Sequence, residues 1–387
     1  MNKAKRPVLL VLVLLLLGAV QFAWAGGEQE EAAAMPAKTI KIGYCAPFTG
    51  PAAEFGANGW RGIQLALEDI NKEGIEVGGE TYGFEIVRYD SRCEPTEAVA
   101  NVRKMAMEDE VKAILGDHCS SCCMAMGPLC DEFQIPGITI ECAADGVTSP
   151  GHEYYFRMRP SMGLMAPLLA PKLIQLFDPE TIGFLAVNDD YGRSFAASFE
   201  ENMSEEGIRT VTKEFFERGS TDFMSLLGKI ESADPDLVFY VGATSEGAMI
   251  TRQAQELGLV PDIKFIGSEE MSEKELVDLA GPDAVEGTYS VALWGSVPAD
   301  FEKRVRDKFD APMHYGILFG YDALTVVKRA IERADSLDPV EIRDAIEKTD
   351  YQGMQGHIKF EDFDKYKNQG RYEPAFIKWE DGEREAM

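Results

Sequence analysis

The pattern that decides the fold opens with "TIKIGYCAPF" at residues 39–48, followed by "GWRGIQLALEDINKEG" at residues 59–74. The first segment is a short apolar run that predicts a strand, and the second has the apolar spacing of an amphipathic helix. Gly74 predicts the end of that helix. Strands that alternate with helices of this length are typical of parallel sheets with helices on both faces.

The same alternation continues through most of the chain. It divides into two series near "YYFRMRP" at residues 154–160. We therefore predict an α/β fold of two doubly wound parallel-sheet lobes. The other predicted strands are YGFEIVRYDS (82–91), VKAILGD (111–117) and IPGITIEC (135–142) in the first series, and TIGFLAVND (181–189), RTVTKEFFE (209–217), DLVFYVG (236–242) and IKFIGSEE (263–270) in the second.

The N-terminus has the pattern of a secretory signal peptide. Three basic residues within the first six precede an apolar run at residues 8–20, and "AWA" at residues 23–25 supplies small residues around a cleavage site. The run is shorter than the roughly 20 apolar residues that span a bilayer. We predict that residues 1–25 are removed after Ala25 on export to the periplasm. Residues 26–38 are mostly small and acidic and predict a flexible leader.

Composition limits the class of protein. The 387 residues exceed what one hydrophobic core supports, so two domains are expected. With 66 acidic against 38 basic residues, the formal net charge is −28, which argues against nucleic acid and anionic lipid as partners. The sequence contains no dinucleotide or phosphate-binding glycine motif, no H-E-x-x-H and no G-x-S-x-G. It predicts neither an enzyme nor a cofactor.

The segments that follow the predicted strands are the candidate ligand-binding residues, because open α/β sheets bind ligands where their strands end. One of them, "GDHCSSCCMAMGPLC" at residues 116–130, holds four of the seven cysteines and one of the four histidines. His118 with Cys119 and the Cys-x-x-Cys spacing allow a metal or redox site. Alternatively, Ser120 and Ser121 begin a helix whose free N–H groups and dipole favour an anion.

These segments carry a resemblance to a known family. Its marks are "FTGPAAEFGANGWRGIQLALEDIN" (48–71), "YDSRCEPTEAVANVRKM" (89–105), "GDHCSS" (116–121), "NDDYGRS" (188–194), "FIGSEE" (265–270), "GYDAL" (320–324) and "FIKWEDG" (376–382). The sequence resembles the periplasmic leucine/isoleucine/valine-binding proteins over about residues 40–379. These are the substrate-binding components of ABC importers.

The resemblance implies the type I periplasmic binding fold. It further implies a monomer that captures a small amino acid or similar ligand by hinge closure and delivers it to an inner-membrane ABC permease. A ligand-sensing protein for a membrane receptor is the alternative. The implied segments are 39–157 and 290–355 for lobe 1, and 158–289 and 356–387 for lobe 2, with crossovers near 156–159, 287–291 and 354–357.

The resemblance also implies four ligand-binding residues in the first lobe. Phe55 would pack on the ligand, Ser120 would bind its carboxylate, and Ala143 would offer backbone groups. Asp145 stands where the family usually has threonine, and an aspartate there would attract an amine rather than a carboxylate. Three of them have an ordinary alternative: Phe55 as a core residue, Ser120 as a helix cap, and Asp145 as a turn-former beside Gly146.

The second lobe supplies two implied ligand-binding residues. Tyr191 would close on the ligand, and Glu269 would pair with its ammonium group. A solvated acid in a loop is the alternative for Glu269. Tyr315 is a weaker candidate because its spacing to "GYDAL" is shifted.

For the cysteines, the resemblance implies a disulfide between Cys93 and Cys119, which an oxidising compartment would preserve. Such a bond would remove Cys119 from a metal or redox site. Cys122, Cys123 and Cys130 are then expected to be small apolar helix residues. Because seven is odd, at least one thiol stays free or pairs with another chain.

Overall fold

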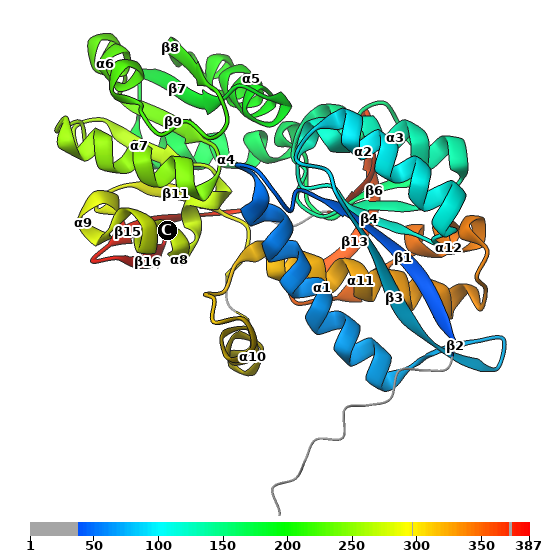
Figure 1. Cartoon of the computed structure of the whole chain (residues 1–387). Helices are drawn as coiled ribbons and strands as arrows, with labels where there is room; N and C mark the ends of the chain where they lie inside the picture. Colours follow the sequence, from blue (N-terminus) through cyan, green and yellow to red (C-terminus); the bar gives the residue numbers. More distant parts are fainter. Residues whose placement is uncertain (1–37, 296, 371–373) are drawn as a thin grey trace, which may run out of the picture. The chain divides into compact units, whose positions relative to one another are not determined.

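The first of two sheets has parallel strands at its centre (Figure 1). The computed structural model describes residues 38–295, 297–370 and 374–387. Strands pair in parallel from β14 through β6, β5, β4 and β1 to β3, and antiparallel pairs complete both edges. In spatial order, this nine-stranded sheet of the described residues contains β12 (Asp350–Gln352), β13 (His357–Phe363), β14 (Tyr366–Gly370), β6 (Tyr155–Arg157), β5 (Gly137–Thr139), β4 (Ile114–Gly116), β1 (Thr39–Ala46), β3 (Glu80–Asp90) and β2 (Ile75–Val77).

The second sheet is built in the same way. Strands from β11 to β8 pair in parallel, and an antiparallel hairpin, β15 with β16, extends one edge. Its seven described strands are, in spatial order, β16 (Glu383–Ala386), β15 (Ala375–Glu380), β11 (Tyr289–Ala292), β10 (Lys264–Gly267), β9 (Leu237–Val241), β7 (Thr181–Val187) and β8 (Arg209–Phe216). The predicted fold class, two lobes with mainly parallel sheets, is confirmed.

Helices accompany each sheet. Those of the first lobe are α1 (Ala53–Glu73), α2 (Pro95–Lys104) with a π-helical turn η1 (Met105–Asp109), α3 (Ser120–Phe133), the 3₁₀ turn η2 (Asp145–Val147), α10 (Ala299–Phe309), α11 (Tyr315–Ala334) and α12 (Pro339–Glu347). Those of the second lobe are α4 (Met162–Phe177), α5 (Asp190–Glu205), α6 (Met224–Ala233), α7 (Thr244–Glu256), the 3₁₀ turn η3 (Glu269–Ser272), α8 (Lys274–Ala280) and α9 (Pro282–Val285). The predicted end of α1 is confirmed, because Gly74 caps it with a positive φ of 86°.

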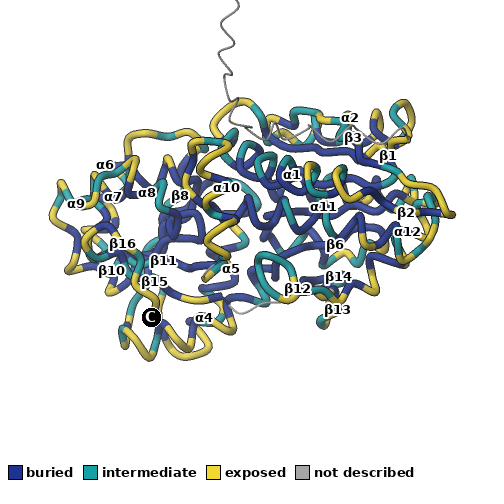
Figure 2. Tube along the Cα trace, turned by 90° about the horizontal axis from the view of Figure 1, so that it is seen from below, coloured by how far each residue is buried: buried dark blue, intermediate teal, exposed yellow. Residues whose placement is uncertain are grey.

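The faces of the first sheet are set by the alternation of side chains along its strands. In β1, Ile42 and Tyr44 belong to the hydrophobic cluster that includes α1 and α11, whereas Cys45 belongs to the cluster that includes α2 and α3. Strands covered on both faces are buried along most of their length (Figure 2). The core of this lobe therefore lies on both sides of its sheet.

Stacked aromatic rings fill the core of the second lobe. Phe184 of β7 and Phe239 of β9 stack with ring centroids 5.4 Å apart. Phe195 and Phe199 of α5 lie 4.6 Å apart, and Phe199 lies 4.6 Å from Phe239. Such contacts between rings add to the free energy gained from burial.

The last stretch of chain in the first sheet begins and ends later than the predicted lobe boundaries. The prediction assigns residues 356–387 to lobe 2, but β13 and β14 pair in the first sheet, so the boundary at residue 356 needs correction. The chain passes to the second sheet between β14 and β15. Likewise β11 pairs with β10 and β15 of the second sheet, although all of it except Tyr289 falls in the predicted first-lobe segment 290–355. Strand pairing over such separations is not encoded locally, which is why the sequence did not show it.

The predicted signal peptide, residues 1–25, lies outside the described residues. So does the leader, except for Lys38. None of the helices in the described part of the chain is both long enough and apolar enough to cross a membrane.

Candidate ligand-binding site

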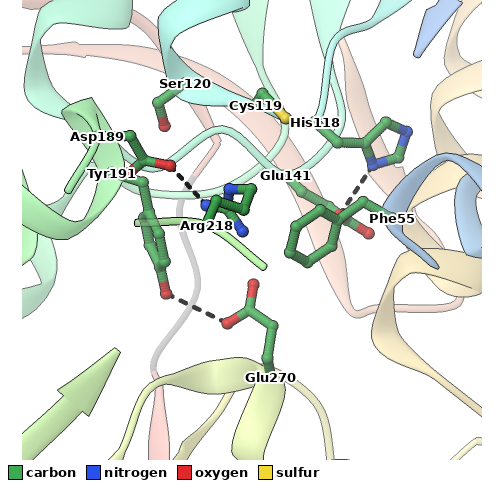
Figure 3. A pocket seen from close by; sticks show the side chains of 9 residues that line it. All are labelled: Phe55, His118, Cys119, Ser120, Glu141, Asp189, Tyr191, Arg218 and Glu270. Carbon is green, nitrogen blue, oxygen red and sulfur yellow. Dashed lines mark hydrogen bonds and ion pairs between the residues drawn. The ribbon is translucent and has the colours of Figure 1, made fainter. Parts of the chain in front are cut away.

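A pocket lies where the strands of both sheets end (Figure 3). Its first-lobe residues follow β1, β4 and β5, and its second-lobe residues follow β7, β8 and β10. This is the position at which open α/β sheets bind ligands. The residues that line the pocket are Phe55, His118, Cys119, Ser120, Glu141, Asp189, Tyr191, Arg218 and Glu270.

The N-terminus of α3 forms one part of the first-lobe wall. Asp117 fixes the preceding turn, because its Oδ1 accepts hydrogen bonds from the backbone N–H groups of His118 (2.6 Å) and Cys119 (2.8 Å). Ser120 Oγ accepts from the N–H groups of Ala143 (3.3 Å) and Ala144 (3.2 Å). The first turn of a helix carries partial positive charge and unpaired N–H groups. This wall is therefore suited to an anionic group.

Two disulfides join this wall to its surroundings. The predicted bond between Cys93 and Cys119 is present, and a second one links Cys123 of α3 to Cys142. The expectation that Cys123 is merely a small apolar helix residue is therefore wrong. The sequence did not show this bond, because the approach of Cys142 depends on the packing of β5 against α3. Cys45, Cys122 and Cys130 are buried free thiols.

The disulfides also bear on the metal and redox alternative. Cys119 and Cys123 are bonded to sulfur and so do not offer thiolates to a metal. Among the residues that the structure describes, no group of three or more His, Cys, Asp or Glu side chains is arranged to hold a metal ion.

Glu270 forms the centre of the second-lobe wall. Its carboxylate accepts hydrogen bonds from Tyr191 Oη (3.2 Å) and Ser268 Oγ (3.3 Å), and from Tyr315 Oη of α11 (2.7 Å). Burial raises the pKa of the Glu270 carboxyl well above its usual range, and the neighbouring Glu269 raises it further. A cationic group placed here would favour the ionised carboxylate and lower this pKa.

Arg218 is a second-lobe residue that lines the pocket beside Asp189 (Figure 3). Its Nη2 is 2.5 Å from Asp189 Oδ2, and its Nη1 is 3.8 Å from Glu246 Oε2. The guanidinium also lies over the Phe55 ring, 5.8 Å from its centroid. Arg218 thus balances two acids of its own lobe while it contacts an aromatic side chain of the other.

A polar chain of side chains completes the first-lobe wall. Glu141 Oε2 is 2.8 Å from His118 Nδ1, and His118 Nε2 is 2.6 Å from Tyr44 Oη. All three side chains are buried. The two ring nitrogens of His118 are therefore both engaged, which fixes the orientation of the imidazole.

The structure brings some of the predicted site residues together and sets others apart. Phe55, Ser120 and Tyr191 line the pocket, whereas Ala143 touches Ser120 through its N–H group. Asp145 accepts a hydrogen bond from the N–H of Gly163 (2.8 Å) and is not among the lining residues.

Glu269 also lies outside the lining. It forms a fully buried ion pair with Arg159, and the next residue, Glu270, faces the pocket instead. The predicted ligand-binding roles stay predictions.

Four charged or polar residues that line the pocket were not expected there from the sequence. His118 was noted only as part of the cysteine-rich stretch, and Glu141, Asp189 and Arg218 were not singled out. Each comes two residues after the end of a parallel strand. A systematic search of strand exits for ionisable residues would have found them.

Comparison with known proteins identifies the family. A family model described as a periplasmic binding protein matches residues 39–383. The leucine-, isoleucine-, valine-, threonine- and alanine-binding protein of Pseudomonas aeruginosa is 30% identical over 343 residues, which cover 86% of this chain and 89% of that protein. A leucine-binding protein from Thermotoga maritima has a TM-score of 0.79 and 25% identity, covering 90% of this chain and 97% of that one.

A third comparison shows the fold alone. A solute-binding protein of an ABC transporter from R. palustris, solved in complex with benzoate, has a TM-score of 0.81 at 18% identity, covering 90% of this chain and 95% of that chain. The resemblance to the leucine/isoleucine/valine-binding proteins is confirmed by the first two matches. This chain belongs to the periplasmic binding protein family.

Proposed function

We propose that this protein is an exported solute-binding protein of an ABC importer that captures an amino acid or an amino-acid-like ligand between its lobes. One observation gives this ligand class its main support. The pocket has an anion-binding wall at Ser120 and the α3 N-terminus, and a carboxylate, Glu270, on the wall from the other lobe. A molecule with a carboxylate and an ammonium group matches both walls.

In this proposal each end of the ligand has its own partner. The ligand carboxylate binds Ser120 and the N–H groups at the start of α3, and the ammonium group binds Glu270, held by Tyr191 and Tyr315. Phe55 packs on the ligand between them. Lobe closure excludes water from these contacts and so strengthens the charged pairings. The ligand is held and released without chemical change.

The family ties support this choice of ligand. The P. aeruginosa relative is named for five amino acids, whereas the R. palustris protein of the same fold is solved with benzoate. Benzoate has no ammonium group and would offer Glu270 of this chain no positive charge to bind. An aromatic acid is therefore the less favoured ligand.

A thermal-shift screen of the protein from Gly26 onward tests the proposal. It would use amino acids, amides, polyamines and aromatic acids. A ligand present at 100 times its dissociation constant stabilises the folded state by about 2.7 kcal/mol. We expect amino acids to raise the unfolding temperature of the unmodified protein, and this rise to be lost in Ser120→Ala and Glu270→Gln.

Ser121→Ala is the matched control, since Ser121 lies in the same helical turn but does not line the pocket. The proposal is wrong if no amino acid shifts the unfolding temperature of the unmodified protein.

The importer and export parts of the proposal need separate measurements. We expect the mature protein to begin after Ala25 and to be a monomer, which intact mass and light scattering of the periplasmic protein would check. Deleting the gene for this protein from its host should abolish high-affinity uptake of the ligand identified in the screen. Unchanged uptake would favour the sensing alternative.

A further inference from the structure

Glu141 lines the pocket and carries an unused hydrogen-bond acceptor. The residue follows β5 by two positions and is only 5% exposed. Its Oε2 contacts His118, whereas its Oε1 has no hydrogen-bond partner in the described part of the chain. Figure 3 shows its carboxylate beside the Phe55 ring, on the side of the pocket away from Ser120.

This arrangement is costly unless something satisfies it. A buried polar atom that makes no hydrogen bond loses its interaction with water and gains nothing in return. The neighbouring backbone is shaped around the same atom, because a Cβ at Gly316 would collide with Oε1 of Glu141. Any larger residue at Gly316 would displace the carboxylate.

The other acids that line the pocket are already engaged. Asp189 pairs with Arg218, and the Glu270 carboxylate accepts from two tyrosines and a serine. Glu141 is the lining acid that keeps an oxygen unpartnered within the described residues. It is therefore the acceptor to which a further donor on a ligand would be directed.

We propose that Glu141 binds an N–H donor on the side chain of the ligand, and that the protein selects amino acids with an ammonium or carboxamide side chain over aliphatic ones. This inference rests on the proposed function, in which Ser120 and Glu270 hold the α-carboxylate and α-ammonium groups. A leucine side chain would cover Oε1 without bonding it. Sites built to hydrogen-bond a group discriminate strongly against ligands that lack it.

Isothermal titration calorimetry with leucine, glutamine and ornithine tests this inference. We expect the unmodified protein to bind glutamine or ornithine roughly 10- to 100-fold more tightly than leucine, the effect of one hydrogen bond to a charged group. Glu141→Leu should reverse or abolish that preference. Glu141→Gln keeps the shape and should spare glutamine more than ornithine.

Glu273→Gln is the matched control. Glu273 is a fully buried glutamate of the second lobe that accepts from Trp294 Nε1 (2.8 Å) and does not line the pocket. It should leave the order of the three ligands unchanged. Thermal unfolding without ligand shows whether each variant is folded. If Glu141→Leu does not fold, the test rests on Glu141→Gln alone.

The outcomes separate this inference from the proposed function. Tighter binding of ornithine identifies an ammonium ligand, and tighter binding of glutamine identifies a carboxamide. If leucine binds as tightly as either, or if both Glu141 variants leave the order unchanged, the inference is overturned while the proposed function stands. If none of the three binds and the wider screen also fails, the proposed function fails with it.

Discussion

On the first-lobe wall of the pocket, disulfides fix residues next to Ser120, whereas the second-lobe wall is held by hydrogen bonds and ion pairs. Cys119 precedes Ser120, and Cys142 precedes Ala143, whose N–H bonds to Ser120. All seven cysteines lie at or before residue 142. Across the pocket, Tyr191, Glu270 and Arg218 are placed by their polar contacts.

The difference separates two ways of organising a binding site. A wall fixed by covalent bonds is ordered before the ligand arrives, so its contribution to affinity carries a small entropic cost. A wall fixed by charges responds to pH, to ionic strength and to the charge of the ligand itself. We therefore expect the first lobe to receive the ligand and the second to adjust to it.

The largest expected effect concerns the ion pair that joins the walls. Arg159 pairs with Glu269 of the second lobe and donates to the carbonyl oxygen of Glu141 (3.3 Å) of the first. Both charged side chains are buried. Arg159→Met leaves the Glu269 carboxylate buried without its partner, and we expect a loss of about 3–5 kcal/mol in unfolding free energy, measured by urea denaturation.

Arg304→Met is the control for that variant. Arg304 pairs with Asp69 (2.7 Å) and Glu68 (3.2 Å), but its side chain is about a third exposed. An exposed pair contributes about 0–1 kcal/mol. Equal losses in the two variants would contradict the idea that the buried pair links the walls.

An intermediate effect is expected from the disulfide between Cys123 and Cys142. The double substitution Cys123→Ala with Cys142→Ala should cost about 3 kcal/mol in urea denaturation, because the bond closes a loop of similar length to those that give this value. The affinity for the ligand should fall as well, since the wall loses its covalent link. Cys130→Ala, which removes a buried free thiol, should preserve affinity.

The smallest effect should come from pH. Glu54 Oε1 of α1 accepts a hydrogen bond from the N–H of Thr244 of α7 (2.8 Å), and burial raises the pKa of Glu54 from 4.5 to about 7. The folded protein thus binds this proton more tightly than the unfolded chain does. The contribution of Glu54 to the free energy of unfolding is therefore complete below about pH 4.5 and is lost as the pH rises through about 7.

Urea denaturation at pH 5 and pH 8 would measure this effect. From pH 5 to pH 8, the unmodified protein should lose more unfolding free energy than Glu54→Gln does. The difference should be modest because Glu54 is partly exposed. Glu108→Gln, at an exposed position, should follow the unmodified protein. An unchanged pH dependence in Glu54→Gln would show that the contact between the lobes does not titrate.

Local sequence patterns predicted most of the fold. Alternating strands and helices carry short-range signals, such as the apolar spacing of α1 and its end at Gly74. The pairing of β14 with β6 joins two residues more than 200 positions apart, Gln369 and Arg157. Local residue spacing does not predict such a pairing.

The site was predicted less completely. Phe55, Ser120 and Tyr191 were expected in the pocket and line it, since the resemblance placed them. Which of the adjacent acids Glu269 and Glu270 faces the pocket depends on the turn η3, in which neighbouring side chains point in different directions. The role of Glu141 depends on how closely α11 approaches it, which only the folded structure shows.

The late return of the chain to the first sheet determines how this protein can be divided. The segment from residue 350 onward supplies β12, β13 and β14 to one sheet, and β15 and β16 to the other. A protease that cuts near residue 350 would strip an edge from both sheets at once. An engineer who wishes to transplant one lobe into a biosensor must carry separate pieces of the chain, because neither lobe is a continuous stretch of sequence.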